Sequence, residues 1–199
     1  MKYNVIALTQ LNSDQIKKLG FLHQRVLHSL LTDLGAPFLE HYYQIARADS
    51  SVIGMCALGA EGNLLGWVVG SPLPGQVARR MSEAGGWFII QVLRVLVANP
   101  KAIWQAFVSL RSASVTMKPG AVELTYLGVD ESARKMGLGR ELLSAFIDAA
   151  RAKGFASVEL SVEAENAAAI ALYTRVGFRV ARSYTEGAFD RHRMELILK

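Results

Sequence analysis

Two stretches of the chain decide how it folds: VELTYLGVDESARKMGLG at residues 122–139 and NAAAIALYTRVGF at residues 166–178. The first reads as an apolar strand, Val122–Val129, followed by a polar turn with two glycines and then by a helix. The second reads as a helix that Asn166 caps and Gly177 ends, because asparagine and glycine are favoured at those two positions. Ser157–Val162, between them, alternates apolar and polar residues as a strand does.

The remaining segments extend this pattern into one mixed α/β domain covering residues 1–199. Apolar residues at helical spacing and short alternating runs mark the other elements. The expected strands are Tyr3–Leu8, Val52–Leu58, Leu64–Val69, Phe178–Ala181 and Met194–Leu198, and the expected helices are Ser13–Ser29, Phe38–Ala48 and Leu138–Lys153. A loop is expected at Tyr184–Arg193, and Gly154 is expected to end its helix in a left-handed conformation.

Residues 72–118 form a helical insertion whose stretch 87–110 is unusually apolar. A membrane span needs about 20 predominantly apolar residues, and Arg94, Pro100 and Lys101 interrupt the run. The pattern therefore favours an insertion packed on the core. A homodimer interface and a membrane-surface contact through 87–110 remain open as alternatives.

The composition bounds the class of protein. The chain has 199 residues, 51% of them hydrophobic and 20% charged, which indicates a globular domain. Its single cysteine, Cys56, excludes an intrachain disulfide, and the first residues lack a signal-peptide pattern, so we expect a cytoplasmic protein. The net charge of +5 favours an acidic ligand. No zinc spacing or RNA-binding motif is present, so we expect neither a metal nor a nucleic-acid partner.

The glycine turn Arg134-x-x-Gly137-x-Gly139 follows a strand and opens a helix. Such a helix start presents unpaired N–H groups and a partial positive charge, which suit a pyrophosphate. The motif is also compatible with a tight turn that binds nothing. A P-loop lysine motif is absent, and Leu142 stands where the dinucleotide fingerprint needs its third glycine.

Asn166, Ala169 and Tyr173 share one face of the second helix, because they are spaced i, i+3 and i+7. A polar cap and a small residue beside a tyrosine make a surface for a slender ligand. The alternative is a capped amphipathic helix whose tyrosine only packs, with its hydroxyl at the rim.

Together the two motifs resemble the GNAT superfamily of N-acetyltransferases, over a match from about residue 121 to the C-terminus. The resemblance implies the acyl-CoA N-acyltransferase fold, with a mostly antiparallel central sheet and flanking helices. It also implies that acetyl-CoA is the co-substrate. The residues expected to bind it are Leu127, Gly128 and Val129 on the strand, Arg134, Lys135, Met136, Gly137, Leu138, Gly139 and Arg140 in the loop, and Asn166, Ala169 and Tyr173 on the later helix.

The resemblance also implies a reaction in which a primary amine attacks the acetyl thioester directly in a ternary complex. Tyr173 is the expected acid for the leaving thiolate, and Glu123 the candidate base for the amine proton. Backbone N–H groups of Leu127–Val129 would hold the oxyanion. Strand alternation places Glu123 on the same sheet face as Thr125 and Leu127.

The acceptor is open at this point. A peptide or protein N-terminus is suggested by similarity to the ribosomal-protein alanine acetyltransferases, and an amino sugar by the apolar insertion. A non-catalytic acyl-CoA-binding regulatory module on the same scaffold is the alternative function. Weaker candidates for acceptor contacts are His23, His28, His41, Tyr184, Glu186 and Asp190.

Overall fold

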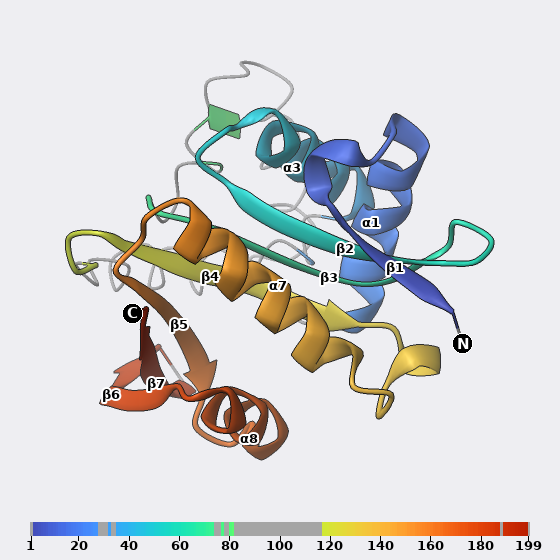
Figure 1. The fold of residues 1–199 in the computed structure, drawn as a ribbon. Coiled ribbons are helices and arrows are strands. Elements are labelled where there is room, and N and C mark those ends of the chain that lie inside the picture. The colour runs from blue at the N-terminus through green and yellow to red at the C-terminus, as the bar shows by residue number, and fades with distance from the viewer. Residues whose placement is uncertain are drawn as a thin grey trace.

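A computed structural model of the chain describes residues 2–27, 32, 35–73, 77, 80–81, 117–187 and 189–198. The expected insertion at 72–118 lies almost wholly outside these residues, including its apolar stretch 87–110, and so does His28. Within the described ranges the chain forms one seven-stranded sheet with helices on both faces (Figure 1). No helix in these ranges is long and apolar enough to cross a membrane.

The sheet is mixed and mostly antiparallel, as predicted. Its spatial order is β1-β2-β3-β4-β5-β7-β6, and among these neighbours only β4 and β5 run parallel. The strands are β1 Tyr3–Ala7, β2 Ile53–Gly59, β3 Leu64–Ser71, β4 Ala121–Val129, β5 Ser157–Glu163, β6 Arg179–Glu186 and β7 Phe189–Ile197.

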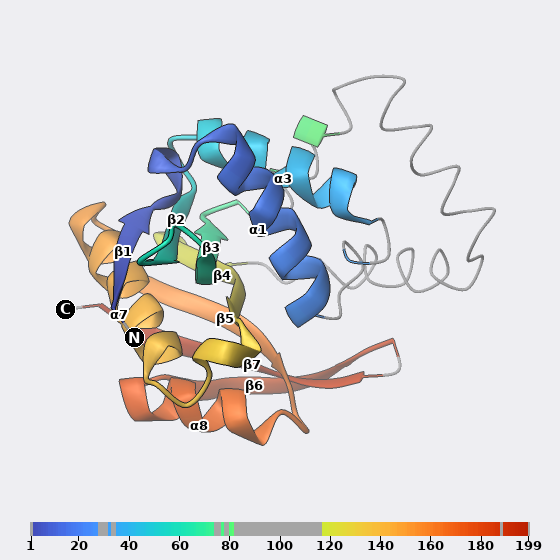
Figure 2. The ribbon, with the colours of Figure 1, turned by 90° about the vertical axis from the view of Figure 1, so that its right-hand side faces the viewer.

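Helices cover the two faces of the sheet unequally (Figures 1 and 2). One core cluster joins α7 and α8 to one face of the sheet, and a second joins α1 and α3 to the other face beside β2 and β3. The helices are α1 Ser13–Val26, α3 Ala36–Ala48, α7 Leu138–Ala152 and α8 Ala167–Val176, with short 3-10 turns at Leu8–Gln10 and Glu131–Ala133.

Local capping signals fix most of the helix ends. Gly154 and Gly177 have φ of +78° and +108°, so both helices end in the left-handed conformation that was predicted. Asn12 caps the start of α1, because its side chain accepts from the Gln15 N–H at 2.9 Å.

The end of the chain is more regular than the sequence suggested. Tyr184, Glu186 and Asp190 were expected in a loop, but they lie in the β6–β7 hairpin. The turn is short because Gly187 takes a φ of +61°, which glycine adopts without strain. Both strands are therefore longer than the predicted Phe178–Ala181 and Met194–Leu198.

β4 carries one extra residue relative to β3. Val69 pairs with Tyr126, but the next residue, Gly70, pairs with Leu124, so Thr125 has no partner on β3. This is a β-bulge, which bends the strand that carries it. The bend falls just after the segment in which β4 is paired with β5.

The bulge also changes which side chains of β4 share a face. Leu124 and Leu127 both belong to the α7 side, whereas Tyr126 belongs to the α1–α3 side, where its ring interacts electrostatically with Glu123. The expectation that Glu123 shares a face with Leu127 is therefore wrong. Simple alternation assumed an unbroken strand, and the extra residue shifts it by one.

Candidate active site

β4 and β5 part in the middle of the sheet. They pair only from Ala121 to Leu124 on β4 and from Ser157 to Leu160 on β5. Past this point β4 continues to Val129 with β3 on one side, and β5 continues to Glu163 with β7 on its far side. Figure 1 shows the two strands diverging. The separation leaves one backbone edge of β4 without a strand partner among the described residues.

The direction of the backbone groups on β4 follows from one hydrogen bond. The Asp130 N–H donates to the Leu65 carbonyl of β3 at 2.8 Å. Because residues of an antiparallel ladder alternate in direction, the Gly128 N–H also faces β3, while those of Leu127 and Val129 face the open edge. Two of the three expected strand donors are thus oriented toward the gap.

The fold gives a steric reason for glycine at position 128. A Cβ placed there would lie 2.3 Å from the ring of Trp67, its cross-strand partner, which is 1% exposed. The glycine therefore makes room for a buried tryptophan.

The loop before α7 is shaped for an anion. Gly137 is the N-cap with φ +82°, and no side chain caps the helix, so the N–H groups of the first turn are left for a ligand. Lys135 also has a positive φ, +63°. Arg134, Lys135, Met136 and Arg140 are exposed, whereas the Leu138 side chain is buried in the core and offers only its backbone.

The fold itself gives no reason for glycine at position 139. Its φ is ordinary, and a Cβ there would lie 3.6 Å from Leu172 and Val129, at normal contact distance. A bare backbone at this point leaves room for a group that approaches the helix start from outside. We take this as evidence that the loop binds a ligand.

Gly139→Ala is expected to weaken binding of acetyl-CoA without destabilising the fold. Alanine suits a helix better than glycine, so the free energy of unfolding should stay within about 1 kcal/mol of the wild-type value or rise. The Kd for acetyl-CoA should increase at least about tenfold, because the added methyl occupies the approach to the first-turn N–H groups. Urea unfolding and calorimetric titration measure the two quantities. An unchanged Kd would contradict a binding role for this residue.

α8 brings Asn166 and Ala169 together as the sequence predicted. The Asn166 Oδ1 accepts from the Ala169 N–H at 3.1 Å, which caps the helix, and its side-chain amide stays exposed. The cap therefore uses the oxygen of Asn166 and leaves the NH₂ group for a ligand.

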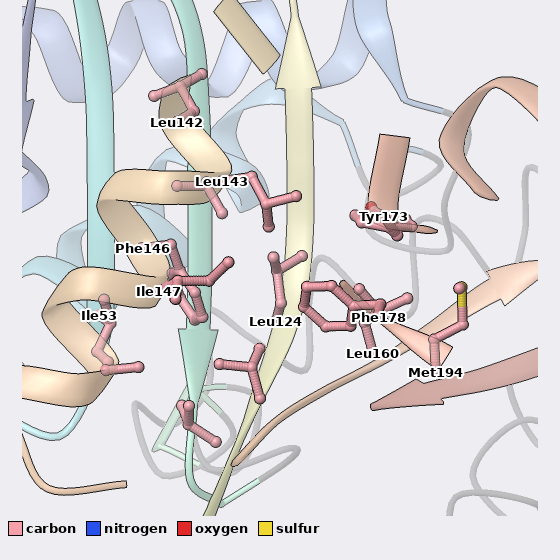
Figure 3. Close-up of a cluster of buried hydrophobic side chains, with 14 of the residues drawn as sticks. Ile53, Leu124, Leu142, Leu143, Phe146, Ile147, Leu160, Tyr173, Phe178 and Met194 are labelled. Carbon is pink, nitrogen blue, oxygen red and sulfur yellow. The ribbon is translucent and has the colours of Figure 1, made fainter. Parts of the chain in front are cut away.

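Tyr173 lies at the boundary between α8 and the gap. Its ring is 8% exposed and contacts Phe178, with ring centroids 5.7 Å apart. In Figure 3 it lies on the other side of the β4 ribbon from Leu142 and Phe146 of α7. Burial raises the pKa of the Tyr173 hydroxyl to about 12, so the hydroxyl is protonated at neutral pH. It is thus in the form that can donate a proton.

Glu123 lies on the opposite face of the sheet, next to a buried arginine. Arg193 of β7 donates to Glu123 at 2.5 Å, to Glu159 of β5 at 2.8 and 3.0 Å, and to the Ser161 hydroxyl at 3.1 Å. Tyr184 of β6 donates to the same Ser161 at 2.9 Å. Sequence reasoning missed Glu159, Ser161 and Arg193. The only signal was polar residues at alternate positions of β5 and β7, which is also the pattern of an ordinary solvated face.

The other candidate polar residues have structural partners. Glu186 pairs with Arg191 at 2.9 Å, and Asp190 accepts from Thr185 at 2.8 Å, so both stabilise the hairpin. Among the residues that the structure describes, no His, Cys, Asp and Glu side chains group in a way that could hold a metal.

His23 is buried among aromatic rings. Its Nδ1 is 2.7 Å from the Tyr43 hydroxyl, and its ring contacts Trp67 and Tyr126. Burial lowers the pKa of His23 to about 4, so the ring is neutral at pH 7. A charged ligand contact is therefore not its role in the resting protein.

The depressed pKa of His23 predicts an acid-sensitive fold. The folded protein binds this proton less readily than the unfolded chain does, so stability present above about pH 6.5 is lost as the pH falls toward 4. His23→Gln should flatten the change in melting temperature between pH 7 and pH 5, whatever its effect at pH 7. An equally steep change in the variant would show that other groups are responsible.

Comparison with known proteins agrees with this geometry. The family model described as the acetyltransferase (GNAT) family matches residues 23–178. The chain belongs to the GNAT acetyltransferase family. The match covers the strands β2 to β5, the glycine loop and α8, and the co-substrate of GNAT enzymes is acetyl-CoA.

Individual relatives of this GNAT protein match over shorter segments. Mycothiol acetyltransferase from Clavibacter michiganensis is 48% identical over 62 residues, which is 31% of this chain and 20% of the relative. The [ribosomal protein bS18]-alanine N-acetyltransferase of Escherichia coli K12 is 44% identical over 70 residues, 32% of this chain and 47% of the relative. The chain thus spans less than half the length of either relative.

The fold is also that of solved GNAT structures. Salmonella typhimurium yncA, solved with its cofactor acetyl-CoA, superimposes with a TM-score of 0.64 at 17% identity, covering 100% of this chain and 95% of that one. The likeness confirms the acyl-CoA N-acyltransferase fold that the sequence predicted.

Proposed function

We propose that this protein is an N-acetyltransferase that moves an acetyl group from acetyl-CoA to a primary amine by direct attack in a ternary complex. One observation carries the proposal. The open edge of β4 begins beyond Leu124, close to Glu123, and Tyr173 belongs to one face of the sheet and Glu123 to the other. This arrangement suits acyl transfer, because the carboxylate could accept a proton from the incoming amine while the tyrosine donates one to the departing thiolate.

The residues present fit acetyl-CoA. The first-turn N–H groups of α7, with Arg134, Lys135 and Arg140, would hold its pyrophosphate, and the exposed amide of Asn166 would contact the opposite side. The N–H groups of Leu127 and Val129 would pair with its extended arm. When bound, acetyl-CoA supplies the thioester carbonyl that the amine attacks.

Two side chains would carry out the proton transfers. A primary amine with a pKa near 10 is mostly charged at pH 7, so it must lose a proton before it can attack, and Glu123 would accept that proton, directly or through a water. Tyr173, protonated because it is buried, would donate a proton to the departing thiolate. An N–H group of Leu127 or Val129 would stabilise the negative charge that develops on the carbonyl oxygen.

A peptide or protein N-terminus is the acceptor class we favour. The support is the likeness to the bS18 alanine acetyltransferase, which acts on a ribosomal protein. An amino sugar is the second candidate. It was suggested by the apolar insertion, which lies outside the described residues.

The test is release of CoA thiol from acetyl-CoA with separate pools of acceptors: peptides, amino sugars including nucleotide-linked ones, and small polyamines. Turnover in one pool would establish the enzyme and its acceptor class. Binding of acetyl-CoA without turnover in any pool would favour the non-catalytic regulatory module.

A further inference from the structure

A buried guanidinium joins three strands at the point where β4 and β5 part. Arg193 and Glu159 are each 4% exposed. Glu159 receives two hydrogen bonds, from Nε and Nη2 of Arg193, while Glu123 and Ser161 each receive one from Nη1. Glu123 lies just before the separation of the strands and Ser161 just after it on β5. The contact therefore spans the closed end of the gap.

Stability alone does not explain this arrangement. A buried ion pair loses so much hydration that well-packed apolar residues would stabilise the protein equally or better. Here two carboxylates share one guanidinium, which leaves an excess negative charge in a largely buried place. A buried charge cluster that packing does not require, and that lies at the proposed site, calls for a functional reason.

We propose that Arg193 is a positioning residue that fixes Glu123 for its role as proton acceptor. The inference rests on the proposed function. Arg193 binds Oε1 of Glu123, and no side chain that the structure describes donates to Oε2, which is left to accept a proton. Glu159 and Glu123 share the one positive charge of the guanidinium, Glu159 through two hydrogen bonds and Glu123 through one at 2.5 Å. Glu123 is thereby held in place without being fully neutralised.

The other groups around Glu123 are neutral or paired. Tyr126 of β4 and Tyr42 of α3 face Glu123, and burial, followed by neighbouring charges, raises the pKa of both hydroxyls. The His23 ring against Tyr126 is neutral at pH 7, and Tyr184 of β6 contributes only a hydroxyl, to Ser161. On the far side of Glu159, the Lys118 side chain pairs with Glu195 of β7 at 2.5 Å, and the Lys118 N–H lies 3.4 Å from Glu159. Arg193, which donates to Glu123, and Glu159, the cross-strand partner of Glu123 on β5, are therefore the charged side chains beside it.

Two substitutions should move the pH profile in opposite directions. Glu159→Gln leaves the guanidinium to Glu123 alone, so the acidic limb, the part of the pH profile where kcat/KM falls as the pH decreases, should move to lower pH. Arg193→Met leaves Glu123 beside an uncompensated carboxylate, so the limb should move to higher pH. We expect about one pH unit in each case, which corresponds to about tenfold in kcat/KM on the limb. Because the two changes remove charges of opposite sign, opposite shifts would show that the group that sets the limb lies beside both Arg193 and Glu159.

Two further variants keep the test interpretable. Arg191→Gln removes an arginine two residues away on β7 that pairs with Glu186 and Glu163, so the limb should stay in place. If Arg193→Met does not fold, the double variant Arg193→Met/Glu159→Gln removes both charges together and leaves no unpaired carboxylate at 159. Its limb should lie at higher pH than that of Glu159→Gln alone.

A failure of the positioning role can be distinguished from a failure of the proposed function. If the wild type turns over but neither variant moves the limb, the positioning role is overturned and the enzyme stands. If the wild type is silent with every acceptor, the Glu123 carboxyl can be titrated by ¹³C NMR of glutamate-labelled protein, assigned with Glu123→Gln. The same opposite shifts in its titration would support the inference without any activity, and their absence would overturn it.

Discussion

Tyr173→Phe is expected to lower kcat by about 10²- to 10⁴-fold, the usual contribution of a positioned acid. The Kd for acetyl-CoA should remain within about twofold, because phenylalanine keeps the ring that packs against Phe178. A loss confined to kcat, with binding preserved, is the signature of an interaction made only in the transition state. The measurements are steady-state CoA-thiol release and calorimetric binding of acetyl-CoA.

Tyr3→Phe is the matched control for losing a tyrosine hydroxyl. Tyr3 donates to Glu141 of α7 at 2.5 Å, and neither side chain is assigned to the reaction, so kcat should not change. If Tyr173→Phe kept full turnover, the acid role would be rejected. If that variant lost acetyl-CoA binding as well, Tyr173 would be a packing residue of the cofactor surface.

The raised pKa of Tyr173 determines the pH range in which its ionisation should affect stability and turnover. The hydroxyl ionises near pH 12 in the folded protein and near pH 10 in the unfolded chain. Its contribution to stability is complete below about pH 10 and is lost as the pH rises toward 12, because the unfolded chain then releases a proton that the folded protein keeps. The pH profile of kcat/KM reports groups of the free enzyme, so a fall in kcat/KM between pH 8 and 10 must come from a group other than Tyr173.

The parts of the site that sequence predicted well are local ones. The left-handed glycines 154 and 177, the Asn166 cap and the glycine turn before α7 each depend on residues within one or two turns of the chain. Such local features can be predicted from the sequence because the type of side chain directly favours a backbone conformation at the same position.

Features that depend on strand pairing were not predictable. The bulge at Thr125 reverses the face of every residue after it on β4, yet nothing in the local composition marks it. The Arg193 cluster brings together residues 34 and 70 positions apart in the chain. Its members become recognisable only when β7 is known to lie beside β5.

Gly128→Ala is expected to reduce the free energy of unfolding by about 3 kcal/mol, at the upper end for adding a methyl to a filled core. The new Cβ would lie 2.3 and 2.4 Å from two atoms of the Trp67 ring, closer than any real contact. The ring cannot easily move away, since it is 1% exposed and packs against His23 with centroids 5.3 Å apart. Urea unfolding should show a lower midpoint with an unchanged slope.

The stability and the acetyl-CoA binding of Gly128→Ala together would show whether the fold or the ligand requires glycine at position 128. Gly139→Ala, in the same family motif region, adds the same methyl at normal contact distance and should leave stability nearly unchanged. Combining Gly128→Ala with Trp67→Phe shrinks the opposing ring, so the double variant should be more stable than the sum of the two single effects predicts, by about 1 kcal/mol or more. If Gly128→Ala instead kept full stability and lost only acetyl-CoA binding, glycine would be required there by the ligand. The steric account predicts the reverse order, because the Gly128 N–H faces β3 rather than the gap.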